Sequence, residues 1–128
     1  MVIDTSAVLA ILLQEPDAES YAQAIGEDPR HLMSAFSLLE TSVVIAARKG
    51  PAAERELDLL IHRARIEVVS FNVEQAEIAR EAWIRYGKGR HPAALNLGDC
   101  CSYALSQVSG EPLLFKGSDF SHTDVRRA

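Results

Sequence analysis

The sequence lacks the cysteines and paired zinc ligands that cross-link many small proteins. It has only two cysteines, Cys100 and Cys101, and because they are adjacent the geometry of an ordinary disulfide between them is unfavourable. No His/Cys pair has the spacing of zinc ligands. A disulfide scaffold and a zinc site are therefore excluded. We expect the cysteines in the core, the scattered histidines on the surface and the protein in a reducing cytoplasm.

Long apolar runs are absent too. The N-terminus has no basic segment, and Asp4 and Glu15 bracket the one early apolar run. We therefore predict neither a signal peptide nor a membrane-spanning helix, and no contact with a membrane. The chain also has no internal repeat and no low-complexity tract.

Positive charge and aromatic side chains are scarce. Lys and Arg total 13 against 18 Asp and Glu, and the formal net charge of −5 argues against binding nucleic acid by bulk positive charge. The aromatic residues (one Trp, three Tyr, four Phe) are too few and too scattered to predict a platform for stacking bases. One basic cluster has two readings, a solvated helix face or a contact with phosphates: Arg80, Arg85, Lys88, Arg90 and His91.

What the chain does have is the composition of a globular protein. Its 128 residues, 48% hydrophobic and 24% charged, predict one domain over 1–128 with a real core. Short apolar strands alternate with helical segments, which predicts right-handed βαβ crossovers and an α/β fold with a mainly parallel sheet. We expect strands near 2–3, 31–33, 66–69 and 113–115, and helices near 5–15, 17–25, 35–49, 51–65, 73–86 and 97–109.

Two carboxylates follow predicted strands. Asp4 comes directly after Val2-Ile3, and Asp119 lies just beyond the strand at 113–115. Ligands of open α/β sheets bind beyond the carboxyl ends of the strands, so both acids are candidate site residues. The alternatives are a helix N-cap for Asp4 and a turn residue for Asp119.

Two further carboxylates lie on predicted helices. Glu40 shares an apolar helix face with Phe36 and Val43, where a carboxylate must be paired, protonated or bound to a metal. Asp99 occupies the first turn of its helix, beside Ser102, where the helix dipole favours negative charge. A partner Lys or Arg for Glu40 and a purely stabilising role for Asp99 are the alternatives.

The four acids together predict a metal site. If the first and last strands are neighbours, the acids meet at one end of the sheet, and four carboxylates so close cannot all stay ionised without cations. Hard divalent ions with oxygen ligands suit them, Mg²⁺ with Mn²⁺ as a substitute. The predicted site comprises Asp4, Glu40, Asp99 and Asp119.

Four segments resemble, in order and spacing, the PIN-domain family and within it the VapC-type toxins of bacterial toxin–antitoxin pairs. Residues 96–104 (NLGDCCSYA) are the closest match. The others are the opening MVIDTSA of residues 1–7, the Leu-Glu-Thr of 39–41, and the closing segment 114–120 with Thr123-Asp124. Ser118 departs from the asparagine typical of that closing turn, which concerns a supporting hydrogen bond and not the acid beside it.

The resemblance implies a three-layer α/β/α PIN-like fold with a mainly parallel central sheet flanked by helices. It also implies Mg²⁺-dependent RNA cleavage, homodimerisation and inhibition by a cognate antitoxin, through which alone the protein would reach operator DNA. Asp4 and Asp99 would be the principal metal ligands, with Asp119 binding directly or through water. Glu40 would position a water molecule or complete a second metal site.

Smaller roles follow from the same hypothesis. Ser6 and Thr5 would orient Asp4 by hydrogen bonding, and the loop 87–91 with Lys116 would contact phosphates. The reaction would be in-line hydrolysis that leaves a 5′-phosphate and a 3′-hydroxyl.

Other classes of protein fit less well. A receiver domain needs a phosphoacceptor Asp at mid-chain, but the segment 66–71 ends in no Asp, and a phosphatase of the haloacid dehalogenase type needs an acid where Ser6 stands. Two alternatives within the fold stay open. They are a housekeeping RNA-processing PIN nuclease and a PIN-fold protein that mainly holds an antitoxin on operator DNA.

Overall fold

Four parallel strands form the centre of the computed structural model, which describes residues 1–128. Their order in the sheet is β3-β2-β1-β4. The bounds are Val2–Ile3 for β1, Leu32–Ser34 for β2, Glu67–Val69 for β3 and Leu113–Leu114 for β4. The first and last strands are therefore neighbours, as a site built from acids at both ends of the chain requires.

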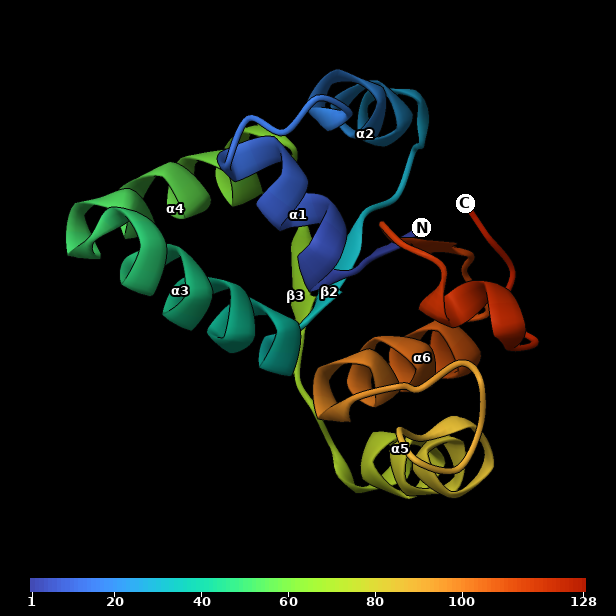
Figure 1. The fold of residues 1–128 in the computed structure, drawn as a ribbon. Coiled ribbons are helices and arrows are strands. Elements are labelled where there is room, and N and C mark those ends of the chain that lie inside the picture. The colour runs from blue at the N-terminus through green and yellow to red at the C-terminus, as the bar shows by residue number, and fades with distance from the viewer.

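Helices cover both faces of this sheet (Figure 1). On one face lie α1 (Thr5–Leu12), α2 (Ala18–Glu27), α3 (Ala35–Lys49) and α4 (Glu54–Arg63); on the other lie α5 (Val73–Tyr86) and α6 (Leu97–Ser109). Two short 3₁₀ helices complete the chain, η1 (Pro51–Ala53) and η2 (Asp119–His122). The predicted three-layer α/β/α fold is confirmed. None of the helices is both long and apolar enough to cross a membrane.

Because side chains alternate in direction along each strand, each face of the sheet has its own hydrophobic core. Val2 is buried against α5 and α6, whereas Ile3, the next residue, is buried against α1, α3 and α4. Leu113 and Leu114 divide in the same way. Successive side chains of a strand point to opposite faces, so two residues of β1 are enough to anchor both helical layers. Asp4 follows at the point where these layers separate.

Capping side chains begin the helices where the sequence predicts. Ser34 accepts a hydrogen bond from Phe36 N (3.2 Å), and Asn72 accepts one from Gln75 N (3.0 Å). At the start of α6 the capping box has both of its bonds, from Asp99 N to Asn96 Oδ1 (2.8 Å) and from Asn96 N to Asp99 Oδ2 (2.9 Å). Each such cap satisfies N–H groups that have no partner within the helix.

Several local expectations are wrong. Gly26 does not end α2, which continues to Glu27, and the predicted helix 51–65 is divided into η1 and α4. The apolar pattern of α6 predicts one core-facing stripe that includes Val108, but nearly all sides of the helix are buried and Val108 is 39% exposed. His31 is not a free surface side chain, because both its ring nitrogens lie within hydrogen-bond distance of backbone carbonyls.

Candidate functional site

Asp4 is held by three donors at the end of β1. The residue is only 3% exposed. Its Oδ2 accepts hydrogen bonds from the backbone N (2.9 Å) and the hydroxyl (2.6 Å) of Ser6, and its Oδ1 accepts one from the Ser102 hydroxyl (2.5 Å). The Ser6 hydroxyl in turn accepts from Lys116 N (2.9 Å). Groups from α1, α6 and the segment after β4 thus fix one carboxylate.

Thr5 does not orient Asp4, contrary to the prediction for it. Its hydroxyl donates to the carbonyl of Ser37 (3.2 Å) and accepts from Thr41 (3.4 Å). Thr5 therefore ties the start of α1 to α3, while Ser6 alone of the two makes the predicted bonds to Asp4. The physical reason is the helix geometry, because an N-cap side chain accepts from the second or third residue after it and not from the first, which is Thr5 here.

Ser102 is the residue that the sequence reading missed. It is fully buried, and its hydroxyl lies 3.2 Å from that of Ser37, which is buried as well. A chain of hydroxyls therefore runs from α3 through α6 to Asp4. The signal was present in the sequence, since Ser102 is one turn after Asp99 and lies among small apolar residues, where a buried hydroxyl needs a partner.

We expect Ser102→Ala to weaken the fold and the site together. Removing a donor from a buried carboxylate costs about 1.5–3 kcal/mol, so the urea midpoint should fall at neutral pH. Because Asp4 is a predicted metal ligand, the loss of its orienting bond should also slow the expected RNA cleavage by about 10- to 100-fold. Ser109→Ala is the matched control, because its hydroxyl bonds only to backbone groups at the far end of α6, the carbonyls of Leu105 and Ser106 and the N–H of Glu111. Equal midpoints for the two variants would show that the Ser102 bond does not stabilise Asp4.

Glu40 projects from α3 against the backbone of α6. A Cβ built on Gly98 would lie 2.5 Å from Oε1 and 2.7 Å from Cδ of Glu40, so any larger residue there would displace the Glu40 carboxyl group. Burial raises the pKa of Glu40, and the charge of Asp4 raises it further, while the hydroxyl of Thr5 acts in the opposite direction. The carboxyl group is thus packed between two helices with another acid near it.

Asp99 lies in the first turn of α6 and is half-buried. Burial is the main cause that raises its pKa, to about 7. The bond from Asn96 N lowers the pKa, but the charges of Asp4, Asp119 and Glu40 all raise it. Four acids distant in sequence therefore act on one another here, in the region where the two helical layers meet beyond β1.

Asp119 is exposed at the start of η2. Its side chain makes no hydrogen bond and no ion pair within the protein. The acid is therefore free to turn toward an incoming group. Its part in a metal site remains a prediction.

The acids are close but are not gathered around a common point. No three His, Cys, Asp or Glu side chains stand together so as to hold a metal ion. None of the four has a cationic partner, since the ion pairs all lie elsewhere. Uncompensated carboxylates with oxygen donors have the chemistry that suits Mg²⁺, and a divalent cation would offset the repulsion that raises the pKa of Asp99. The residues present therefore fit the ion.

Of the basic residues predicted to contact phosphates, some form ion pairs and others do not. The ammonium of Lys116 is paired with Glu15 and with Asp17 (2.8 Å), so it does not present the free cation that a phosphate contact would need. Arg85 is within 3.6 Å of Asp124. The remaining cations of the predicted cluster, Arg80, Lys88 and Arg90, form no ion pair.

Known proteins are similar to this chain in sequence and in fold. The family model described as PIN domain matches residues 1–126. Ribonuclease VapC of Mycolicibacterium smegmatis is 58% identical over 125 residues, which cover 98% of this chain and 97% of that protein. The crystal structure of Mycobacterium tuberculosis VapC20, described as a sarcin-ricin loop cleaving toxin, superposes with a TM-score of 0.82 at 18% identity, over 99% of this chain and 97% of that one. VapBC2 from Rickettsia felis, bound to a DNA fragment from their promoter, gives a TM-score of 0.75 at 13% identity, over 99% and 96%.

Proposed function

Because this chain belongs to the PIN-domain family and, within it, to the VapC ribonucleases, we propose that it hydrolyses RNA with Mg²⁺ as the toxin of a toxin–antitoxin pair. One observation carries the proposal: four acids act on one another at the end of β1, and none of them has a cationic partner. A site used only for structure would neutralise such charges within the protein. Here the charge is left for a ligand to compensate.

The side chains have distinct parts in this mechanism. Asp4, fixed by Ser6 and Ser102, and Asp99, fixed by the capping box, present oxygens as the principal ligands. Asp119 adds a further oxygen directly or through water. When bound, Mg²⁺ lowers the pKa of water and offsets the charge that grows on the scissile phosphate.

Glu40 acts on the attacking water. Because its pKa is raised by burial, its carboxylate is a better proton acceptor than an ordinary glutamate, and its packing against Gly98 fixes where it points. Glu40 therefore orients the water or helps to hold a second ion. Attack in line with the leaving 3′-oxygen leaves a 5′-phosphate on one fragment and a 3′-hydroxyl on the other.

Assembly belongs to the same proposal. Leu39 and Val43, one turn apart on α3, are 62% and 60% exposed. Such an apolar strip beside the acids favours a homodimer that brings two sites near one another. Inhibition by a cognate antitoxin, and contact with operator DNA only through it, complete the proposal. The Rickettsia felis structure, in which VapBC2 is bound to a DNA fragment from their promoter, supports this part of the proposal.

The first test is the chemistry of the products. Purified protein with a mixture of structured RNAs should cleave in Mg²⁺ or Mn²⁺ and not in EDTA, and the fragments should carry 5′-phosphate and 3′-hydroxyl ends. Asp58 is an exposed acid on α4 that is not one of the four acids, so Asp58→Asn should cleave as the wild type does. Fragments that end in 2′,3′-cyclic phosphate would contradict the mechanism, because that product needs the RNA 2′-hydroxyl as nucleophile. An antitoxin reading frame directly upstream would separate the toxin from a housekeeping nuclease.

A further inference from the structure

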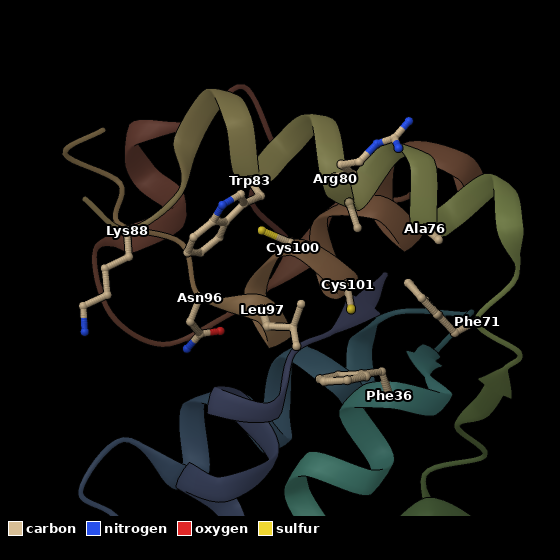
Figure 2. A pocket seen from close by; sticks show the side chains of 11 residues that line it. Phe36, Phe71, Ala76, Arg80, Trp83, Lys88, Asn96, Leu97, Cys100 and Cys101 are labelled. Carbon is tan, nitrogen blue, oxygen red and sulfur yellow. The ribbon is translucent and has the colours of Figure 1, made fainter. Parts of the chain in front are cut away.

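An apolar groove of about 660 Å³ lies beside the acids and has no part in the mechanism above. Three aromatic rings line it, those of Phe36, Phe71 and Trp83, and two cations border it, Arg80 and Lys88. Figure 2 shows the rings entering one space from three segments, with Lys88 and Arg80 at opposite sides of them. The sequence predicted aromatic residues too scattered for a stacking platform, but the fold brings these three rings to one groove. We call this site the aromatic groove.

The rings in the groove are available for contact. Trp83 and Phe71 are each 38% exposed, and the centroids of Phe36 and Phe71 are 6.4 Å apart with the rings tilted by 53°. Two buried thiols, Cys100 and Cys101, lie at its floor. The groove is thus an apolar slot with aromatic walls.

The groove and the acids share two helices. Phe36 is four residues before Glu40 on α3, a spacing that places both on one side of the helix. On α6, Asn96 lines the groove and caps Asp99 through its Oδ1, while its Nδ2 donates to no protein atom. An RNA strand bound at the acids would therefore reach the groove within about one helical turn.

The cations decide which kind of occupant fits. Arg80 and Lys88 form no ion pair, although the chain carries a net charge of −5 and acids are plentiful. Two unpaired cations at the sides of an aromatic slot complement a ligand that is a flat apolar body between phosphates. An apolar helix from another protein would fill the slot but leave both cations and the free amide of Asn96 without partners.

We propose that the aromatic groove holds an unpaired base of the RNA next to the cleaved phosphate, with Arg80 and Lys88 on the flanking phosphates. The base stacks on Trp83 and Phe36, as unstacked bases do on aromatic side chains in single-stranded RNA sites. Asn96 donates its amide to the edge of the base. The groove thereby makes cleavage depend on a base that is free to leave its helix, which selects loops over duplexes. This inference rests on the proposed ribonuclease function.

Trp83 allows the groove to be tested directly, because it is the only tryptophan in the chain. Its fluorescence is followed while RNA hexamers of adenosine, cytidine or uridine, or a hexamer of the same backbone without bases, are added. Ca²⁺ replaces Mg²⁺ in the buffer, so that the acids are compensated by an ion of looser geometry. At least one base-bearing hexamer should quench Trp83 saturably, and the abasic hexamer should not.

Three variants give a second readout, the polarisation of a labelled hexamer. Trp83→Leu should weaken binding by about tenfold, since one base loses its stacking partner. Trp83→Phe, which keeps a ring, should stay within about threefold of the wild type. Ile84→Ala, an exposed neighbour on the same helix, should bind as the wild type does.

The outcomes separate this inference from the proposed function. If quenching requires a base but the protein cleaves no RNA, base binding in the groove would be supported and the proposed ribonuclease activity would be contradicted. Cleavage without base-dependent quenching would keep the nuclease and overturn the groove. Trp83 fluorescence that changes only with protein concentration would also overturn it, because a second copy of the chain would then occupy the groove.

Discussion

Asp99→Asn should abolish metal-dependent cleavage and at the same time stabilise the metal-free protein at pH 8. Loss of groups that merely support metal ligands costs about 10- to 100-fold, so loss of a charged ligand should cost at least about 100-fold. The capping box survives, because the amide oxygen of Asn can still accept from Asn96 N. What the variant removes is a carboxylate that the fold holds against three other acids.

The sign of the stability effect follows from the pKa. Burial and the neighbouring charges raise the pKa of Asp99 from 3.8 to about 7 in the folded protein. Below about pH 4 the group is protonated in both states, and it adds no penalty. As the pH rises from about 4 to 7 the unfolded chain ionises first, so the folded state loses stability, and above pH 7 the loss is complete. Asp99→Asn removes this loss.

The gain should appear only at high pH. We expect the melting temperature in EDTA to rise by about 3–9 °C at pH 8, which corresponds to about 1–2 kcal/mol after solvent screening of a half-buried group. Only a small part of this difference should remain at pH 4. Mg²⁺ should stabilise the wild type more than the variant, because only the wild type keeps its full ligand set. A variant that is less stable than the wild type at pH 8 would refute the account of Asp99 as a repelled acid, and Asp58→Asn controls for the general effect of removing a charge.

Gly98→Ala should reduce cleavage by about 100-fold while the fold stays intact. The added methyl group meets the carboxyl group of Glu40, with Oε1 only 2.5 Å away. That carboxyl group is the far end of a flexible side chain, so it can turn aside at little cost in stability. A displacement of about 1 Å at a group that orients the reaction can cost a factor of about 100. Gly26→Ala on α2 is the control, because nothing lies within 4 Å of its added Cβ.

A second variant identifies the route of this effect. In a Glu40→Gln background the carboxylate is already lost, so adding Gly98→Ala should change the cleavage rate by no more than about twofold. Rates should be taken from single-turnover experiments, and melting temperatures should confirm that each variant folds. If the two changes multiply, Gly98→Ala acts on something other than Glu40, and the packing of α3 against α6 would not be what positions the acid.

Local signals in the sequence carried much of the fold. Ser34, Asn72 and Asn96 each cap a helix that begins where the sequence predicts, because a cap depends on residues within three positions of it. The parallel order of strands followed from their alternation with helices. The end of α2 could not be read in this way, because Gly26 is tolerated inside a helix whose apolar residues still pack on α1.

The contacts that complete the site could not be predicted from local sequence signals. The bond from Ser102 to Asp4 joins residues 98 positions apart, and the fit of Gly98 to Glu40 depends on how closely two helices pack. Thr5 and Ser6 are adjacent and chemically alike, and only the direction of the first turn of α1 assigns one to α3 and the other to Asp4. The residue types that form a site can thus be predicted, whereas their partners depend on the packing of the layers.

The order of the strands determines when the site can exist during synthesis. β1 holds Asp4 at the start of the chain, but its neighbour β4 and the helix that carries Asp99 and Ser102 are made last. A nascent chain that ends before α6 has Asp4 and Glu40 without the partners that fix or complement them. Contacts between distant residues form late in folding. The proposed site is therefore incomplete until translation of the chain is nearly finished.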